Sequence, residues 1–141
     1  MHILFIDIDG VLHPTDATDH STGWFCWLHV LFALLEPHPE VRLVVHSSWR
    51  YEYEDAELRQ LLGPVGKWFS GSAPRMRREQ AIHAVLQANK AAVASYLVLD
   101  DDVKEFEGSS LNVVFCDSKL GISEARVQAL VAAWLSSTAP H

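Results

Sequence analysis

Short apolar runs alternate along this chain with longer segments in which apolar residues recur at helical spacing. Such runs are typical of strands buried on both faces of a sheet, and they predict five strands. These strands cover residues 3–6, 41–46, 65–70, 96–99 and 111–115. The helical spacing predicts helices over residues 24–36, 54–62, 77–89 and 124–135, with residues 136–141 as a fraying tail. Strands that alternate with helices favour a three-layer α/β fold around a parallel sheet.

Two carboxylates stand where the first predicted strand ends. Asp7 and Asp9 follow the apolar run of residues 3–6, and Gly10 comes directly after them. Asp is unfavourable inside a strand, and residues at positions i and i+2 of an extended chain point to the same side. Both carboxylates are therefore expected at one spot beyond the carboxyl end of the strand, where open α/β sheets bind ligands. Two like charges so close require a cation or a shared proton.

A second acidic cluster, Asp100-Asp101-Asp102, ends the predicted strand of residues 96–99. If the two strands are neighbours, Asp100 and Asp101 converge with the first carboxylate pair on one point. Such a hard, oxygen-lined site suits Mg²⁺. Asp102 is expected to be a cap or a solvated charge, and a solvated loop is the alternative for the whole run.

Residues 7–11 resemble the first motif of the haloacid dehalogenase (HAD) superfamily, whose members are mostly Mg²⁺-dependent phosphatases. Calcium-binding loops share the DxDG pattern, but they continue with further oxygen ligands, whereas Val11 and Leu12 follow here. The other three motifs of the superfamily occur in the expected order, and the resemblance covers nearly the whole chain. It implies a Rossmann-like parallel sheet of strand order 5-4-1-2-3 without a large cap domain.

The second motif, a Ser or Thr at the tip of the second strand, is matched by Ser47, with Ser48 as the alternative. A hydroxyl and free N–H groups at such a tip donate to phosphate oxygens, although the serines could instead cap the next helix. The third motif is a Lys or Arg that opens the helix before the fourth strand. Arg78 matches it by its spacing to the apolar helix face, and Arg75 is the second choice. A solvated basic turn is the alternative for these arginines.

The resemblance implies phosphoryl transfer with Asp7 as the nucleophile and Asp9 as the general acid and base. The acid role requires the pKa of Asp9 to be raised relative to that of Asp7. Ser47 and Arg78 would hold the transferring oxygens as charge develops. The implied Mg²⁺ ligands are Asp7, Asp100 and Asp101 of the fourth motif, and the backbone carbonyl of Asp9.

Further candidate substrate-binding residues are Gly10, Ser48, Arg50 and Arg75. Arg50 either reaches a phosphate through a bidentate fork or pairs with the acidic run between Glu52 and Glu57. The arginines between residues 75 and 78 put positive charge at the N-terminus of a predicted helix, which is already the positive end of the helix dipole. A bound phosphate or the first carboxylate pair is expected to offset this charge.

The intervals between the first three motifs are filled by predicted helices, so no cap domain is expected. An open site suits a phosphate on a large substrate, such as a nucleic-acid end or a phosphoprotein, although an oligomer could supply a lid. The segments 47–50 and 121–123 and the small size resemble the compact HAD domains of RNA-repair proteins. The predicted function is Mg²⁺-dependent phosphomonoester hydrolysis. A noncatalytic phosphate-binding or interaction module and a phosphotransferase are the alternatives.

The length of 141 residues predicts one domain over residues 1–141. The formal charge of −7 argues against broad attraction to nucleic acid. Cys26 and Cys116 fit no metal spacing and are too few for a disulfide framework, which favours a reducing cytoplasm. The N-terminus lacks the basic region of a signal peptide, and the apolar segment of residues 24–35 is too short to cross a bilayer. A cytoplasmic protein with a phosphorylated substrate and no membrane partner is therefore expected.

Overall fold

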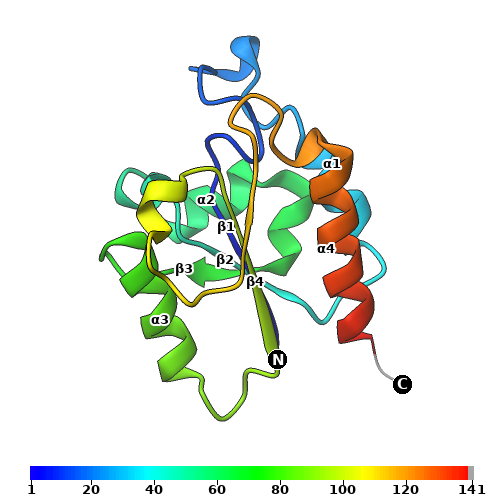
Figure 1. Cartoon of the computed structure of the whole chain (residues 1–141). Coiled ribbons are helices and arrows are strands. Elements are labelled where there is room, and N and C mark those ends of the chain that lie inside the picture. The colour runs from blue at the N-terminus through cyan, green and yellow to red at the C-terminus, as the bar shows by residue number, and fades with distance from the viewer. Residues whose placement is uncertain (140–141) are drawn as a thin grey trace.

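The computed structural model describes residues 1–139 and is built around a five-stranded, all-parallel sheet (Figure 1). The strands are β1 (His2–Ile6), β2 (Arg42–Val45), β3 (Phe69–Ser72), β4 (Ser95–Asp100) and β5 (Val113–Phe115). They lie in the order β3-β2-β1-β4-β5, so β1 is central and β4 is its neighbour. The predicted α/β class and the strand order implied by the HAD resemblance are confirmed.

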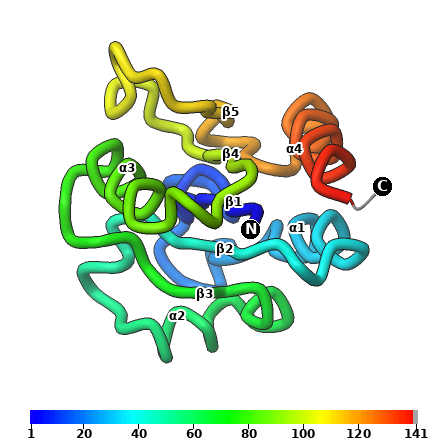
Figure 2. Tube along the Cα trace, turned by 90° about the horizontal axis from the view of Figure 1, so that it is seen from below, coloured from blue at the N-terminus to red at the C-terminus, as the bar shows by residue number. Residues whose placement is uncertain are grey.

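Helices cover both faces of the sheet, and Figure 2 shows α3 on one side with α1 and α4 on the other. The helices are α1 (Leu28–Leu35), α2 (Asp55–Leu61), α3 (Arg78–Ala88) and α4 (Ala125–Thr138). Successive residues of a strand point to opposite faces, so β1 serves two cores. Leu4 and Ile6 share a core with residues of α1 and α4, whereas Ile3 and Phe5 share one with α3. Burial on both faces explains why β1 is apolar throughout its centre.

The predicted strand over residues 65–70 is displaced along the chain. Residues Gly63–Trp68 form a 3-10 helix with Pro64 at its start, and β3 begins only at Phe69. Val65 and Trp68 are buried because this short helix packs against α1 and α2. Their apolar character therefore reflects packing of a helical turn and not a strand.

Two predicted helix boundaries also differ from the structure. The helix expected to begin at residue 24 begins at Leu28. Phe25 has a φ of 59°, in the left-handed region, which interrupts a right-handed helix. The last helix runs on to Thr138, so the tail expected to fray from residue 136 is helical over its first part. Residues 140 and 141 lie outside the described residues.

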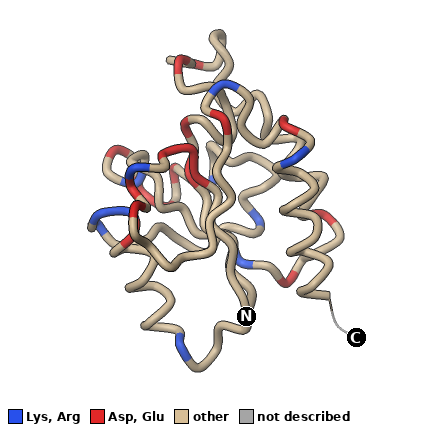
Figure 3. The backbone as a smooth tube through the Cα atoms, viewed as in Figure 1, with Lys and Arg blue, Asp and Glu red and all other residues tan. Residues whose placement is uncertain are grey.

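The carboxyl ends of the strands carry the loops that matter for function. The loop after β1, the 3-10 helix η2 (Ser48–Tyr51) after β2 and the 3-10 helix η4 (Val103–Phe106) after β4 lie at this edge. Acidic residues gather there (Figure 3). As predicted, no segment of residues 1–139 forms a cap domain over this edge. Among the described helices, none has both the length and the apolar character that crossing a membrane requires.

Candidate active site

Asp7 lies directly after β1, in the middle of the carboxyl edge of the sheet. Its N–H donates to the Leu99 carbonyl of β4 at 3.0 Å, which ties the residue to the neighbouring strand. The residue is only 1% exposed, and its Oδ1 accepts a hydrogen bond from the Ile8 N–H at 2.8 Å. Burial, and then the negative charge of Asp100, raise the pKa of Asp7 well above its ordinary value against the opposing effect of Arg78.

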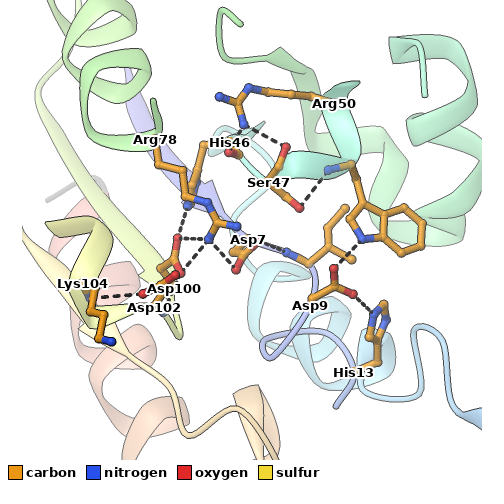
Figure 4. A network of polar contacts seen from close by, with 12 residues as sticks. Asp7, Asp9, His13, His46, Ser47, Arg50, Arg78, Asp100, Asp102 and Lys104 are labelled. Carbon is orange, nitrogen blue, oxygen red and sulfur yellow. Dashed lines mark hydrogen bonds and ion pairs between the residues drawn. The ribbon is translucent and has the colours of Figure 1, made fainter. Parts of the chain in front are cut away.

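Arg78, the first residue of α3, joins Asp7 to Asp100 (Figure 4). Its Nη1 donates to Oδ2 of Asp7 and to both carboxylate oxygens of Asp100, each at 3.0 Å. Burial lowers the pKa of Arg78, but the two carboxylates outweigh burial and raise it. The structure thus places the first choice among the predicted arginines in the acidic site, while Arg75 is exposed.

Asp7, Asp100 and Asp101 form an acidic cluster in which one carboxylate oxygen from each residue lies within 4.8 Å of the others. Gly10 lets Asp101 approach, because a Cβ at Gly10 would lie only 2.2 Å from Oδ2 of Asp101. Its φ of 77° also favours glycine. When all three carboxylates are ionised, the single positive charge of Arg78 leaves an excess of two negative charges, and the raised pKa values of Asp7 and Asp101 show that this state is unfavourable without a cation. Hard oxygen ligands with that excess fit a divalent cation such as Mg²⁺.

His46 supports Asp100 from the tip of β2. Its ring is fully buried, and Nε2 lies 2.8 Å from Oδ2 of Asp100. Burial lowers the pKa of His46, so the ring is neutral and donates one N–H to the carboxylate. The Asp102 N–H donates to Oδ1 of Asp100 at 2.9 Å. These contacts fix the orientation of the carboxylate toward Arg78.

Asp9 comes from the same strand end but turns to different partners (Figure 4). Its Oδ1 lies 2.7 Å from Nε2 of His13, its Oδ2 accepts from Nε1 of Trp49 at 3.0 Å, and the side chain is 42% exposed. Partial burial raises the pKa of Asp9, but the hydrogen bonds from His13 and Trp49 outweigh burial and lower it. In the metal-free protein the pKa of Asp7 is thus raised and that of Asp9 is lowered, the reverse of the order expected for the Mg²⁺-loaded site, which stays a prediction. Burial decides the pKa of Asp7, and hydrogen bonding decides that of Asp9.

His13 is held in one tautomer by its surroundings. The Phe25 N–H donates to Nδ1 of His13 at 3.0 Å, so the ring proton resides on Nε2 and points toward Asp9. Phe25 donates from a left-handed backbone that bulky residues rarely adopt. The buried ring also contacts the rings of Phe25 and Trp49. His13 therefore serves Asp9 as a rigid hydrogen-bond donor.

The two serines of the predicted second motif lie at the tip of β2 and differ in exposure. Ser47 is buried, and its Oγ accepts a hydrogen bond from the Trp49 N–H at 3.2 Å. This is the capping contact that the sequence left open as an alternative, and it leaves the hydroxyl hydrogen of Ser47 without an acceptor in residues 1–139. Ser48 is exposed and lines a pocket beside Asp9.

Arg50 is buried and bound to the main chain. Its five N–H donors contact the hydroxyl of Tyr51 and the main-chain carbonyls of His46, Ser47, Pro74 and Met76. No donor remains for the predicted phosphate contact. The alternative is not observed either, because residues 1–139 contain no ion pair between Arg50 and the acidic run of residues 52–57. Arg50 instead joins the tip of β2 to the loop before α3.

Residues 3–127 match a family described as the HAD domain in Swiss Army Knife RNA repair proteins. The chain belongs to this family. The matched range contains the whole acidic cluster together with Asp9 and Arg78. Searches of curated proteins and of solved structures found no match.

Three polar residues of this HAD domain were missed by sequence reasoning, namely His13, His46 and Trp49. His46 had a usable signal, since it ends an apolar strand at the edge where α/β sheets bind ligands. His13 and Trp49 had none. His13 reaches Asp9 because the chain turns at Gly10, whose N–H donates to the His13 carbonyl. Trp49 reaches Asp9 from η2, which follows the neighbouring strand β2.

The acidic cluster of this HAD domain opens to solvent through a pocket of about 360 Å³, which we call the acidic pocket. It is lined by Asp7, Asp9, Thr15, Arg78, Asp101, Asp102 and Ser118. The nucleophile and acid predicted from the first motif therefore face one cavity together with the predicted basic residue.

Proposed function

We propose that this HAD domain is a Mg²⁺-dependent phosphomonoester hydrolase that acts through an aspartyl-phosphate on Asp7. One observation carries the proposal: Asp7 is buried where two further carboxylates and the guanidinium of Arg78 meet, and Asp9 faces the same pocket. The HAD family is typically phosphohydrolase, which supports the same chemistry.

Asp7, Asp100 and Asp101 would hold the metal ion, and the backbone carbonyl of Asp9 stays a predicted further ligand. When bound there, Mg²⁺ supplies positive charge that polarises the phosphoryl group and keeps Asp7 ionised. His46 holds Asp100 in place for this role, and Gly10 gives Asp101 the room to approach.

The two carboxylates of the first motif divide the chemistry. Asp7 attacks phosphorus, the bond between phosphorus and the ester oxygen breaks, and Asp9 gives its proton to that oxygen. Asp9 then takes a proton from water as the water attacks the aspartyl-phosphate and releases phosphate. The lowered pKa of Asp9 suits the second step, and the negative charge of an incoming phosphate favours the protonated form needed for the first.

Arg78 and Ser47 are the proposed phosphate ligands. The hydrogen bonds of Arg78 within residues 1–139 all come from Nη1, which leaves Nε and Nη2 for phosphate oxygens. Within the described residues the Oγ of Ser47 is used only as an acceptor, which leaves its hydroxyl hydrogen to donate. Both groups would stabilise charge that develops on the transferring oxygens.

A nucleic-acid end is the proposed substrate class. The family to which the chain belongs is described from RNA repair proteins. No cap covers the acidic pocket in residues 1–139, so a phosphate at the end of a long chain can enter. The net charge of −7 means that recognition would depend on local contacts and not on broad electrostatic attraction.

The test is hydrolysis of p-nitrophenyl phosphate with and without Mg²⁺, compared between wild type, Asp7→Asn and the control Asp117→Asn. Asp117 is an exposed carboxylate that accepts from the Lys119 N–H, outside the acidic pocket. Turnover that needs Mg²⁺, survives in Asp117→Asn and is lost in Asp7→Asn supports the proposal. Absence of turnover in all three proteins over a range of pH would overturn it in favour of a binding module. Turnover that rises with added alcohol acceptors would identify a phosphotransferase.

A further inference from the structure

A second pocket, of about 310 Å³, adjoins the acidic pocket at Asp9. It lies between the loop after β1, which provides Thr15, Thr18 and Trp24, and the segment after β2, which provides Ser48, Glu52 and Tyr53. Trp49 lies at its inner wall. We call it the aromatic pocket. The two pockets share Asp9 and Thr15, whereas Asp7, Arg78 and Asp101 line only the acidic one.

The position of Asp9 assigns the two pockets to the two parts of a phosphomonoester. Asp9 gives its proton to the leaving oxygen in the proposed mechanism, so the group attached to that oxygen must lie beside Asp9. The phosphoryl group belongs with Asp7 and Arg78 in the acidic pocket. The aromatic pocket therefore receives the leaving group.

The walls of the aromatic pocket favour a flat ring. Trp24 and Tyr53 are only partly buried, so each retains accessible ring surface. Their positions are fixed, because Trp24 donates from Nε1 to the Ala17 carbonyl at 3.2 Å and Tyr53 stacks on Trp49 with an interplanar angle of 22°. Trp24 meets the Trp49 ring edge-on at a centroid distance of 4.9 Å. Rigid aromatic side chains are the usual platforms for nucleobases.

The polar groups of the aromatic pocket select against a charged leaving group. Within residues 1–139, no Lys or Arg lines it, and Asp9 and Glu52 make it acidic. A second phosphate is therefore disfavoured inside it. The Glu52 carboxylate can accept N–H or O–H hydrogen bonds, and the hydroxyls of Thr15, Thr18 and Ser48 can donate or accept them. A nucleoside offers a stacking face together with base N–H groups and ribose hydroxyls, whereas a phenol offers only the face.

We infer that the aromatic pocket binds the terminal nucleoside that carries the phosphate, with its base on Trp24 and Tyr53 and its polar edge toward Glu52. This inference rests on the proposed function, because it assigns the pocket through the role of Asp9. It adds a substrate-binding site and explains how a protein with a net negative charge can recognise a nucleic-acid end. Stacking and hydrogen bonds replace attraction to the phosphate backbone.

The test compares adenosine 3′- and 5′-monophosphates with ribose 5-phosphate, which lacks the base. Wild type is expected to prefer the nucleotides by about tenfold or more in kcat/KM, the size of one stacking contact. Trp24→Leu and Tyr53→Leu are expected to abolish that preference, because kcat/KM should fall further for the nucleotides than for ribose 5-phosphate, which has no base to stack. Trp134→Leu, on α4, controls for loss of a partly buried aromatic residue. Glu52→Ala, at an exposed position, is expected to lower the preference by about threefold, as for one hydrogen bond.

Calorimetric binding of the same three ligands to Asp7→Asn protein gives a readout that does not need turnover. The inference is overturned if this protein binds ribose 5-phosphate as tightly as the adenosine monophosphates, or if wild type prefers phosphotyrosine to both nucleotides. Hydrolysis of p-nitrophenyl phosphate without any preference for nucleotides would overturn the nucleoside site and support the proposed phosphatase activity. Nucleotide binding without hydrolysis of any phosphate would support the nucleoside site and overturn the phosphatase activity.

Discussion

Asp7 and Asp9 stand two residues apart in one motif, yet the protein surrounds them in opposite ways. Asp7 is 1% exposed and sits among two carboxylates and a guanidinium, whereas the side chain of Asp9 is 42% exposed and accepts hydrogen bonds from two neutral rings. Burial raises the pKa of Asp7, and hydrogen bonds lower that of Asp9.

This contrast shows that the motif supplies the carboxylates but not their chemistry. The surroundings of Asp7 come from β4 and α3, while those of Asp9 come from the loop after β1 and from η2. The Asp7 side gathers carboxylates that could hold a metal ion, and the Asp9 side holds a carboxylate in a fixed direction at the edge of solvent. The proposed division of labour, with Asp7 as nucleophile and Asp9 as acid, would rest on these separate supports.

Removal of Arg78 should disturb the Asp7 side most. Arg78→Met leaves three clustered carboxylates without their guanidinium and removes a proposed phosphate ligand, so kcat/KM for p-nitrophenyl phosphate should fall about 10²–10³-fold. Chemical unfolding of the metal-free protein should show a loss of up to about 3 kcal/mol, because buried charges lose their partner. Arg75→Met is the matched control, since Arg75 is exposed and its guanidinium lies 5.8 Å from the centre of the Tyr51 ring. Equal losses in both variants would contradict the placement of Arg78 in the site.

Gly10→Ala, compared with Gly108→Ala, distinguishes an effect on the metal site from an effect of backbone strain alone. Gly10 and Gly108 both have positive φ, 77° and 72°, but a Cβ at Gly108 meets nothing within 4 Å. Gly108→Ala should therefore cost only the left-handed backbone penalty of about 1 kcal/mol. Gly10→Ala should add displacement of Asp101, so its Mg²⁺ dissociation constant should rise by about tenfold or more. Titration calorimetry measures this, and unchanged Mg²⁺ affinity in Gly10→Ala would remove Asp101 from the proposed ligands.

His13 tests the Asp9 side alone. His13→Leu removes the Nε2 donor, so Asp9 loses its orientation, and kcat for an alkyl phosphate should fall about tenfold. Hydrolysis of p-nitrophenyl phosphate should change less, because nitrophenolate leaves with little help from an acid. His13→Gln keeps a donor and should recover part of the loss. If both substrates lose activity equally, His13 supports the fold and not the acid.

The smallest expected effect is on the pH dependence of stability, which tests the burial that distinguishes Asp7 from Asp9. In the unfolded chain the Asp7 carboxyl has its ordinary pKa of 3.8, and burial raises its pKa in the folded state. The stability that Asp7 contributes is thus full below that value and is lost as pH rises through the folded pKa. Metal-free Asp7→Asn should therefore gain stability relative to wild type between about pH 4 and pH 7 in urea unfolding. A difference that stays constant with pH would show that Asp7 is not desolvated.

Much of this arrangement could be predicted from the sequence because strand ends are local features. The apolar centre of β1 and the carboxylates that follow β1 and β4 place Asp7, Asp100 and Asp101 at one edge once the strands are neighbours. The neighbour relation itself came from the family resemblance, since no local pattern states strand order. The prediction of a strand over residues 65–70 was wrong in its bounds, because a buried 3-10 helix has the same apolar run as a strand.

The supports of the two carboxylates could not be predicted, because they depend on how loops return over the sheet. His13 meets Asp9 through the turn at Gly10 and the left-handed backbone at Phe25. Arg50 looked like a phosphate ligand by its charge, but burial directs its guanidinium to main-chain carbonyls. The directions of the two pKa shifts in the metal-free protein could not be predicted for the same reason, since burial and hydrogen bonding are properties of the folded chain.

Chemical trapping of the intermediate tests the central claim, that Asp7 carries the phosphoryl group. The protein is mixed with p-nitrophenyl phosphate and Mg²⁺, quenched in acid and reduced with borohydride, which converts an aspartyl-phosphate to homoserine. Mass spectrometry of the peptide that contains Asp7 and Asp9 then locates the change. Homoserine at position 7, present only with substrate, is the predicted result. Turnover of the same sample with position 7 unmodified, or with the change at position 9, would contradict the account.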